Sequence, residues 1–266
     1  MRFVAFVLFL LAWIVTSTPA SAITNGSADG NTHPEVGALI GDEPNPDGTW
    51  SYCTGTLISP TVFLTAAHCG ERGQKTARVS FAARYEPGAP TYQGRYIPDP
   101  RFKDSEDAHD MAVVVFDRPV DGIQPALLPP PGLLDRADDT GDLDTARFTS
   151  VGYGSSAATR AKKSRDWHYS YTDTRRQAAI SFKDLSPRWL DLTPRSEREG
   201  STCFGDSGGP NFLGGPESHL LVATSISGAD DACAKTNFDY RLDTATSRRF
   251  LGRFVTLPAP AAELAR

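Results

Sequence analysis

The sequence predicts an all-β protein built from many short strands. Three observations support this prediction: short stretches rich in β-branched and aromatic residues, turns of Gly, Pro and Asp between them, and no helical pattern long enough to connect parallel strands. The 20 Pro and 23 Gly residues are spread along the chain, and 22% of the residues are charged, as in a globular protein. A length of 266 residues is enough for two barrels of roughly 100 to 120 residues, each with its own core.

Two series of strands are expected, one in each half of the chain. The first covers residues 36–40, 50–58, 61–65, 77–82 and 111–116, and the second covers 146–152, 178–182, 220–227 and 238–242. Between them lie a proline-dense segment, 119–131, and an acidic run, 135–144, which lacks the spacing of a calcium loop and is expected to be a solvated loop. We therefore predict one domain over 23–132 and another over 133–255.

After the strands, residues 245–254 have apolar or small residues three and four apart, which predicts a helix. Residues 256–266 are expected to form a loose tail.

The N-terminus has the pattern of a secretory signal peptide. Arg2 precedes the apolar run Phe3–Val15, and the next segment ends in the small-x-small pattern Ala20-Ser21-Ala22. The alternative is a membrane anchor, but the thirteen apolar residues are fewer than the roughly 20 that span a bilayer. We expect removal of residues 1–22, a mature chain that begins at Ile23, secretion to the extracellular space, and no membrane association after cleavage.

Charge and cysteine content narrow the classes of partner and cofactor. The formal net charge is −5, and loss of Arg2 with the leader makes it −6, which argues against nucleic acid as a partner. Four cysteines in an exported chain predict two disulfides, and three pairings are open. Pairing Cys53 with Cys69 and Cys203 with Cys233 would close loops of about 17 and 31 residues. Neither CxxC nor HExxH occurs, so no metal and no cofactor is expected.

Three short motifs carry residues suited to nucleophilic catalysis. They are Leu64-Thr65-Ala66-Ala67-His68-Cys69, His109-Asp110-Met111-Ala112-Val113-Val114 and Cys203-Phe204-Gly205-Asp206-Ser207-Gly208-Gly209-Pro210. Together they resemble the trypsin/chymotrypsin family of serine proteases, which has the same order of His, Asp and Ser. The resemblance extends over residues 23–255. It implies two antiparallel Greek-key β-barrels with the active site between them and a C-terminal helix.

The resemblance also implies the roles of the site residues. His68, Asp110 and Ser207 would form a catalytic triad, because a serine hydroxyl needs a base to take its proton and the base needs a carboxylate to orient it. The N–H groups of Gly205 and Ser207 would form the oxyanion hole. The expected reaction is hydrolysis of peptide bonds in proteins or peptides through an acyl-enzyme on Ser207.

The expected specificity pocket departs from the trypsin pattern. In the family, the residue six before the nucleophile forms the pocket floor and is Asp where Lys or Arg is selected; here it is Ser201. The resemblance places these residues in the walls: Thr202, Ser225, Ile226, Ser227 and Phe238. The Phe238 ring would fill much of the cavity, so we expect cleavage after small or medium apolar residues. A shift of one residue over 229–240 would instead bring Asp239 near the pocket and restore basic specificity.

The segment Ile23-Thr24-Asn25-Gly26 resembles the mature N-terminus of the family. The resemblance implies that the freed amino group of Ile23 pairs with Asp206 and holds the oxyanion loop in place. Because the segment directly follows the expected cleavage site, signal peptidase would also activate the enzyme.

Two other functions remain open from the sequence. The chain could be an inactive relative that binds a partner, although all three triad residues are present, or a secreted esterase that uses the same acyl transfer. As an active protease it is expected to be a monomer, with protein protease inhibitors as further partners.

Overall fold

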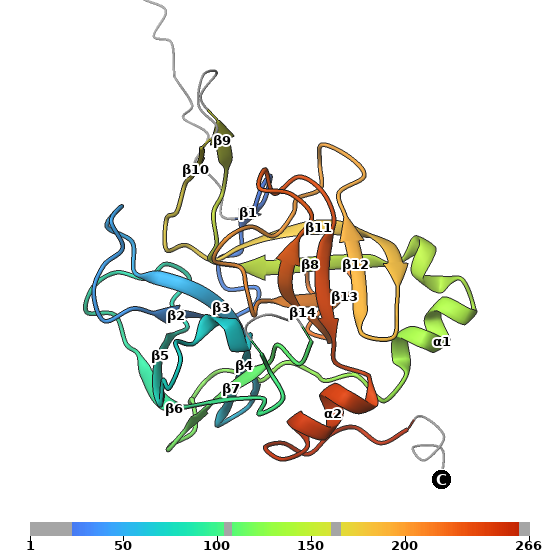
Figure 1. Cartoon of the computed structure of the whole chain (residues 1–266), viewed down its shortest axis with the longest axis horizontal. Helices are drawn as coiled ribbons and strands as arrows, with labels where there is room; N and C mark the ends of the chain where they lie inside the picture. The colour runs from blue at the N-terminus through green and yellow to red at the C-terminus, as the bar shows by residue number, and fades with distance from the viewer. Residues whose placement is uncertain (1–22, 104–107, 161–165, 261–266) are drawn as a thin grey trace, which may run out of the picture.

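The computed structural model of the chain describes residues 23–103, 108–160 and 166–260. Two β-barrels lie side by side, the first in blue to green and the second in yellow to red (Figure 1). The first is a closed antiparallel barrel with strand order β2-β3-β4-β7-β6-β5. Its strands are β2 (Val36–Ile40), β3 (Ser51–Ser59), β4 (Val62–Thr65), β5 (Thr76–Ser80), β6 (Tyr92–Pro98) and β7 (Ala112–Phe116).

The second barrel has strand order β11-β12-β15-β14-β13-β8 and is closed by pairing of β11 with β8. Its strands are β8 (Arg147–Gly152), β11 (Arg176–Leu185), β12 (Trp189–Thr193), β13 (Pro210–Leu213), β14 (Leu221–Gly228) and β15 (Asn237–Arg241). Strand β1 (Ser27–Ala28) pairs with β11, and the hairpin of β9 (Ala158–Arg160) and β10 (Trp167–Tyr169) projects from the barrel (Figure 1). The predicted all-β fold of two antiparallel barrels is confirmed.

The alternation of side chains along the strands explains both cores. In the first barrel, Leu57, Phe63, Val79 and Val114 point inward and are fully buried. In the second, Phe148, Ile180, Leu192 and Val222 form an equivalent cluster. A third cluster, which includes Val36, Val151 and Phe212, joins the barrels. The active-site loops are therefore attached to two packed units.

The helices are short. The predicted C-terminal helix is confirmed as α2 (Ala245–Leu251), which begins where the Thr244 hydroxyl accepts a hydrogen bond from the N–H of Ser247 at 3.2 Å. The acidic run is not the solvated loop we expected. It forms α1 (Leu133–Asp139) and the 3-10 turn η2 (Asp142–Thr145), because Leu134 and Leu143 anchor it in the core of the second barrel.

Two disulfides connect the loops that surround the site. Cys53 pairs with Cys69 and Cys203 with Cys233, which confirms the expected number and the pairing of near neighbours. No helix in the described part of the chain is both long and apolar enough to cross a membrane. The expected signal peptide, residues 1–22, and the end of the tail, 261–266, lie outside the described residues.

A buried ionic network joins the N-terminal segment to both barrels. The guanidinium of Arg175 donates to Asp29 Oδ2 at 2.8 Å and to the carbonyl of Val36 at 2.9 Å, and neither Arg175 nor Asp29 is substantially exposed. His33 Nδ1 lies 2.6 Å from Asp29 Oδ1. Burial alone would raise the pKa of Asp29, but the hydrogen bonds from His33 and Arg175 hold it below its ordinary value. The carboxylate thus stays ionised and fixes the segment that follows Ile23.

Candidate active site

The histidine and aspartate of the predicted triad meet between β4 and β7 of the first barrel. His68 lies in the 3-10 turn η1 (Ala67–Cys69), and Asp110 stands directly before β7. The imidazole Nδ1 lies 2.6 Å from Asp110 Oδ2, and the backbone N–H of His68 donates to Asp110 Oδ1 at 2.9 Å. The Asp110 side chain is 2% exposed and that of His68 is 37% exposed. This geometry keeps a proton on Nδ1 and leaves Nε2 free to accept one.

A buried tyrosine supports the turn that carries His68. The hydroxyl of Tyr96, on β6, lies 2.9 Å from the carbonyl oxygens of both Ala66 and Ala67. Burial raises the pKa of Tyr96, so the hydroxyl keeps its proton and remains a hydrogen-bond donor. Together with the Cys53–Cys69 disulfide, this contact fixes η1 against the barrel wall.

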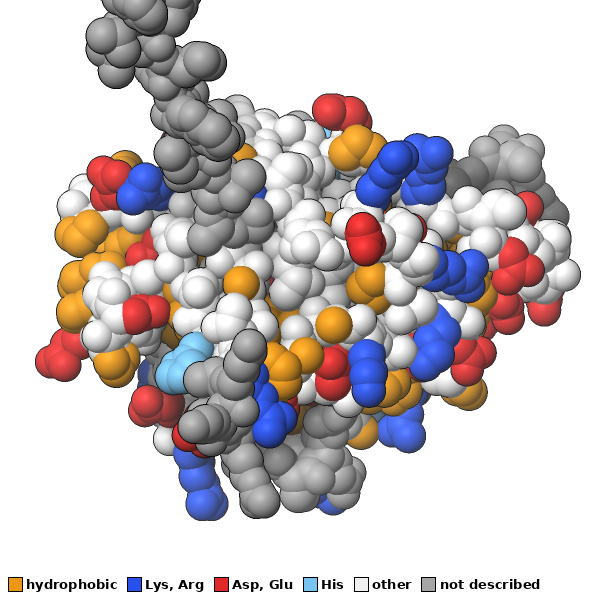
Figure 2. Space-filling view, turned by 90° about the horizontal axis from the view of Figure 1, so that it is seen from above, with side chains coloured by type: hydrophobic (Ala, Val, Ile, Leu, Met, Phe, Trp, Pro, Cys, Tyr) orange, Lys and Arg blue, Asp and Glu red, His pale blue; other side chains and the backbone are white. Residues whose placement is uncertain are grey.

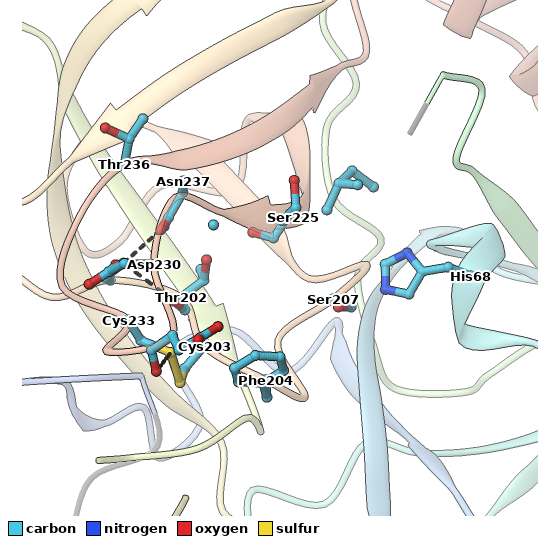
Figure 3. Close-up of a pocket in the computed structure, with 15 residues that line it drawn as sticks. His68, Thr202, Cys203, Phe204, Ser207, Ser225, Asp230, Cys233, Thr236 and Asn237 are labelled. Atoms are coloured by element: carbon cyan, nitrogen blue, oxygen red, sulfur yellow. Dashed lines mark hydrogen bonds between the residues drawn. A yellow bond between two sulfur atoms is a disulfide. The ribbon is translucent and has the colours of Figure 1, made fainter. Parts of the chain in front are cut away.

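The loop that carries Ser207 is clamped between the barrels. The carbonyl of Ser207 accepts a hydrogen bond from the N–H of Thr54 at 3.0 Å, and the N–H of Gly208 donates to the carbonyl of Ser225 at 2.7 Å. Gly208 has a φ of +81°, and a Cβ there would meet the backbone of Ala66 and Thr54. Only glycine fits this approach. Figure 3 shows Ser207 beside the imidazole of His68.

The backbone of the same loop presents two amide groups on one side. Gly205 has a φ of +94°, and the N–H of Asp206 is turned away to donate to the carbonyl of Cys203 at 2.9 Å. Within the described ranges, the N–H groups of Gly205 and Ser207 donate to no protein acceptor. This arrangement can bind a developing negative charge on a carbonyl oxygen.

Asp206 is a fully buried carboxylate beneath the loop. Its oxygens accept hydrogen bonds from the N–H groups of Cys203, at 2.9 Å, and Gly154, at 2.8 Å. Burial raises the pKa of Asp206 to about 7, and the two hydrogen bonds offset only part of that effect. No Lys, Arg or His of the described residues forms an ion pair with it.

The N-terminal segment lies against the same region. Ile23 is fully buried, and the N–H of Thr24 donates to the carbonyl of Ser201 at 3.1 Å. In the full-length chain the nitrogen of Ile23 belongs to the peptide bond with Ala22, so it carries no charge. The structure therefore brings Thr24, the neighbour of Ile23, to Ser201, and the ion pair between a freed Ile23 amine and Asp206 stays a prediction for the cleaved chain.

A pocket of about 370 Å³ opens beside His68 and Ser207 (Figure 3). Five residues predicted for it do line it: Ser201, Thr202, Ser225, Ile226 and Ser227. Phe238 does not line it, so the expectation that its ring fills the cavity is wrong. Sequence reasoning missed further lining residues, among them Gly228, Asp230, Asp231, Thr236 and Asn237.

The pairing of β14 with β15 explains this correction. The register shifts between Ser225 and Ser227, so that Asn237 lies opposite Gly228 and Phe238 lies opposite Ser227. Because side chains alternate along a strand, Phe238 points away from the pocket that Asn237 faces. The Asn237 side chain is buried, and its Oδ1 accepts a hydrogen bond from the Ser201 hydroxyl at 2.6 Å. The pocket floor thus consists of a hydroxyl bound to an amide.

Asp239 is a buried carboxyl group next to the pocket wall but not in it. It is fully buried and does not line the pocket, so the alternative register that would have restored basic specificity is not found. Its two oxygens have no well-formed hydrogen bond within the part of the chain that the structure describes. Burial raises the pKa of Asp239 well above its ordinary value, and the nearby Ser225 and Asn211 side chains offset only part of this shift.

Asp239 therefore gives a testable pH dependence of stability. Because the pKa of Asp239 is higher in the folded than in the unfolded protein, the folded protein keeps this proton to higher pH. The stability that protonated Asp239 contributes is complete below the unfolded pKa of about 3.9 and is lost as pH rises towards the folded pKa. Asp239→Asn removes this titration, so the variant is expected to gain stability over the parent by up to about 1.4 kcal/mol per pH unit in that window. Urea unfolding from pH 4 to 8, with Ser207→Ala in both proteins to prevent self-digestion, measures the difference. A difference that does not change with pH would contradict the prediction.

The fold and the geometry at His68, Asp110 and Ser207 define a two-barrel serine hydrolase. Comparison with known protein families identifies the family within this class. The family model described as Trypsin matches residues 29–248, so the chain belongs to this family of serine endopeptidases. A trypsin of Saccharopolyspora erythraea is 27% identical over 199 residues, which cover 70% of this chain and 79% of the relative. Kallikrein-5 of Homo sapiens is 28% identical over 232 residues, or 82% of this chain and 71% of the relative.

Proposed function

We propose that the chain cleaves peptide bonds through an acyl-enzyme on Ser207, with His68 as the base and Asp110 as the residue that orients it. The observation that carries this proposal is the 2.6 Å contact between His68 Nδ1 and Asp110, with Ser207 beside the other edge of the imidazole. Nε2 takes the Ser207 proton as the hydroxyl oxygen attacks the substrate carbonyl. The imidazolium then gives that proton to the leaving amine, and water, activated by the same imidazole, releases the acyl group.

The two free amide groups of the loop stabilise the intermediate. The N–H groups of Gly205 and Ser207 donate to the oxyanion, and each such donor contributes about 3 to 4 kcal/mol to transition-state stabilisation.

The enzyme acts as a monomer on proteins or peptides, and protease inhibitors that occupy the same cleft are its further partners. We place the domain boundary between residues 132 and 133, after the crossing segment that follows β7.

The proposed preference before the scissile bond is non-tryptic, for small or medium apolar residues. The supporting observation is the floor: Ser201 bonds to Asn237, and no carboxylate stands at either position. Asp230 and Asp231 line the pocket from the β14–β15 loop, but Asp230 Oδ1 accepts hydrogen bonds from the N–H groups of Ala234 and Lys235. The floor formed by Ser201 and Asn237 therefore offers no charge to pair with the end of an Arg or Lys side chain.

A covalent serine-directed phosphonate together with a peptide library tests this function. We expect labelling of Ser207 and faster cleavage after Ala, Val, Leu or Thr than after Arg or Lys. An unlabelled protein would indicate the partner-binding alternative, whereas labelling with ester turnover but no peptide turnover would indicate an esterase. Preferential cleavage after Arg would overturn the proposed specificity alone.

Asn237→Ala tests the role of the floor. Removal of the amide lengthens the cavity, so the ratio of kcat/KM for Phe over Ala before the scissile bond is expected to rise about tenfold, the effect of one or two methylene-sized groups in a pocket. Phe238→Ala is the matched control, because this neighbour lies outside the pocket and should leave the ratio unchanged. An increase in the control, or none in Asn237→Ala, would show that the register assigned to β15 is wrong.

We also propose that the chain is secreted, with the leader 1–22 removed after Ala22, and that the released Ile23 amine pairs with Asp206. Two observations support this: Ile23 is already buried and its neighbour Thr24 donates to the carbonyl of Ser201, and Asp206 is a buried carboxylate without a cation among the described residues. The two disulfides are those expected in an oxidising compartment. Insertion of the amine would supply the missing charge and hold the oxyanion loop.

A further inference from the structure

We propose that a second pocket, on the leaving-group side of Ser207, selects a basic side chain after the scissile bond through the carboxylate of Asp47 and an aromatic wall. This inference rests on the proposed peptidase function, because it concerns the part of the substrate that leaves with the amine. Its ligand is the side chain of Arg or Lys at the first or second position after the cleaved bond.

The position of the pocket follows from the residues it shares with the site. A cavity of about 580 Å³ includes His68, Phe204, Gly205 and Ser207, and it continues along the Cys53–Cys69 disulfide to the loop before β3. The specificity pocket shares His68, Phe204 and Ser207 but lies on the second barrel. A peptide that places its residue before the scissile bond in the specificity pocket must therefore continue, past Ser207, into this second cavity.

The wall of this cavity is aromatic. Its lining includes Tyr52, Tyr171 and Phe204. Phe204 is 49% exposed, yet its ring packs against Tyr169 with a centroid distance of 4.6 Å, and the Tyr169 hydroxyl donates to the carbonyl of Asp231 at 3.1 Å. The exposed aromatic surface is thus held in place. Aromatic faces attract guanidinium and ammonium groups through the negative charge above the ring.

Asp47 gives the cavity its charge. It is the one Asp, Glu, Lys or Arg among the lining residues that the structure describes. Its Oδ1 accepts hydrogen bonds from the N–H and the hydroxyl of Thr49, at 3.0 and 2.6 Å, which fixes the carboxylate at the end of the loop. Asp47 and Tyr171 line the same cavity, and burial and, next, the charge of Asp47 raise the pKa of Tyr171. In the described part of the chain no cation forms an ion pair with Asp47.

Figure 2 shows acidic and hydrophobic side chains together over the left part of the molecule, where the first barrel lies, and acidic side chains also among the Lys and Arg over the second barrel. Because acids lie over both barrels, the assignment to Asp47 rests on the lining of the cavity. A second acid of the same loop, Asp42, differs from Asp47 in two ways: it is paired with Arg78 at 3.2 Å, and it does not line the cavity. Asp42 therefore provides a matched control.

Acyl transfer measures this pocket directly. The enzyme first forms an acyl-enzyme from a small ester. The acyl group is then transferred either to water or to an added dipeptide amide that carries Arg at its first or second position, and the ratio of the two products is measured. The reference is the same dipeptide amide with citrulline in place of Arg, which has nearly the same shape and no charge. We expect Arg to capture the acyl group about 3- to 10-fold better than citrulline at one of the two positions, the effect of an exposed ion pair combined with an aromatic contact. The advantage should shrink in high salt.

Two variants locate the effect. Asp47→Asn keeps an oxygen that accepts from Thr49, so the loop is preserved, and the Arg-to-citrulline ratio should fall to about 1 to 2. Asp42→Asn should leave the ratio at the parent value. Equal capture of Arg and citrulline by the parent, or an equal loss in both variants, would overturn the inference while the proposed peptidase function stands. Absence of any ester turnover by the parent would overturn the proposed function and, with it, this inference.

Discussion

Ser207→Ala is expected to lower peptide hydrolysis by about four to six orders of magnitude, because it removes the oxygen that attacks the substrate while His68 and Asp110 remain. The residual rate comes from the oxyanion donors and substrate binding, which the variant keeps. Single-turnover kinetics with the best library peptide measure the loss. They also show whether any acyl-enzyme forms, which separates the loss of nucleophile from a loss of binding.

The variant should fold as the parent does. The loop around Ser207 is held by its backbone, through the hydrogen bonds of Thr54 to Ser207 and of Gly208 to Ser225, and by the Cys203–Cys233 disulfide. The hydroxyl contributes to none of these contacts. A thermal midpoint within a few degrees of the parent is the expected control. Turnover above about a tenth of the parent rate, in protein shown by mass spectrometry to carry Ala, would mean that Ser207 is not the nucleophile.

The sequence predicted those features whose determinants are local. The strands follow from short stretches of β-branched and aromatic residues between turn residues, and the motifs around His68 and Ser207 contain the cysteines and glycines that hold their turns. The barrel closure and the meeting of the three segments came from the resemblance of these motifs to a known family. The short helix α2 was predictable because its period and its Thr244 cap are both local.

The features that sequence reasoning missed depend on register or on distant contacts. The register shift between Ser225 and Ser227 cannot be read from residue types, and it decides that Asn237, not Phe238, faces the pocket. The helix α1 forms in an acidic run because Leu134 reaches the core of the second barrel. Asp47 had no motif of its own; it became a candidate only because the first barrel brings its loop to Tyr171 and Phe204.

Retention of one extra residue before Ile23 is expected to cause the second-largest loss of activity, after loss of the nucleophile. A chain that begins with Met directly before Ile23 should fold with both disulfides, yet its activity should fall by about two to three orders of magnitude, the cost of losing an ordered oxyanion donor. The reason is electrostatic. The Ile23 nitrogen would be an uncharged amide, and Asp206, which has a pKa of about 7 when burial is not offset by a cation, would remain without a partner.

Activity and stability should then be lost with rising pH in different pH windows for the two chains. In the chain that begins at Ile23, pairing with Asp206 raises the pKa of the amine, so its stabilising contribution is complete below the ordinary pKa of a chain-terminal amine, about 7.7 to 8.0, and is lost as pH rises through the higher folded pKa. In the chain with the extra Met, Asp206 has the raised pKa. The stability that its protonation provides is present below about pH 3.9 and is lost as pH rises through about 7.

The experiment compares the two chains by phosphonate labelling rate and by urea unfolding from pH 5 to 10, with mass spectrometry to confirm each N-terminus. The expected result is slow labelling of the Met-extended chain at every pH and a loss of its stability as pH rises from 5 to about 7, a range in which the pairing of the Ile23 amine is still complete in the other chain. Asp206→Asn in the Ile23 chain is the matched variant, because it removes the same ion pair from the other side and should label equally slowly. Rapid labelling of the Met-extended chain would show that the oxyanion loop is ordered by its backbone contacts to Cys203 and Gly154 alone, without the amine of Ile23.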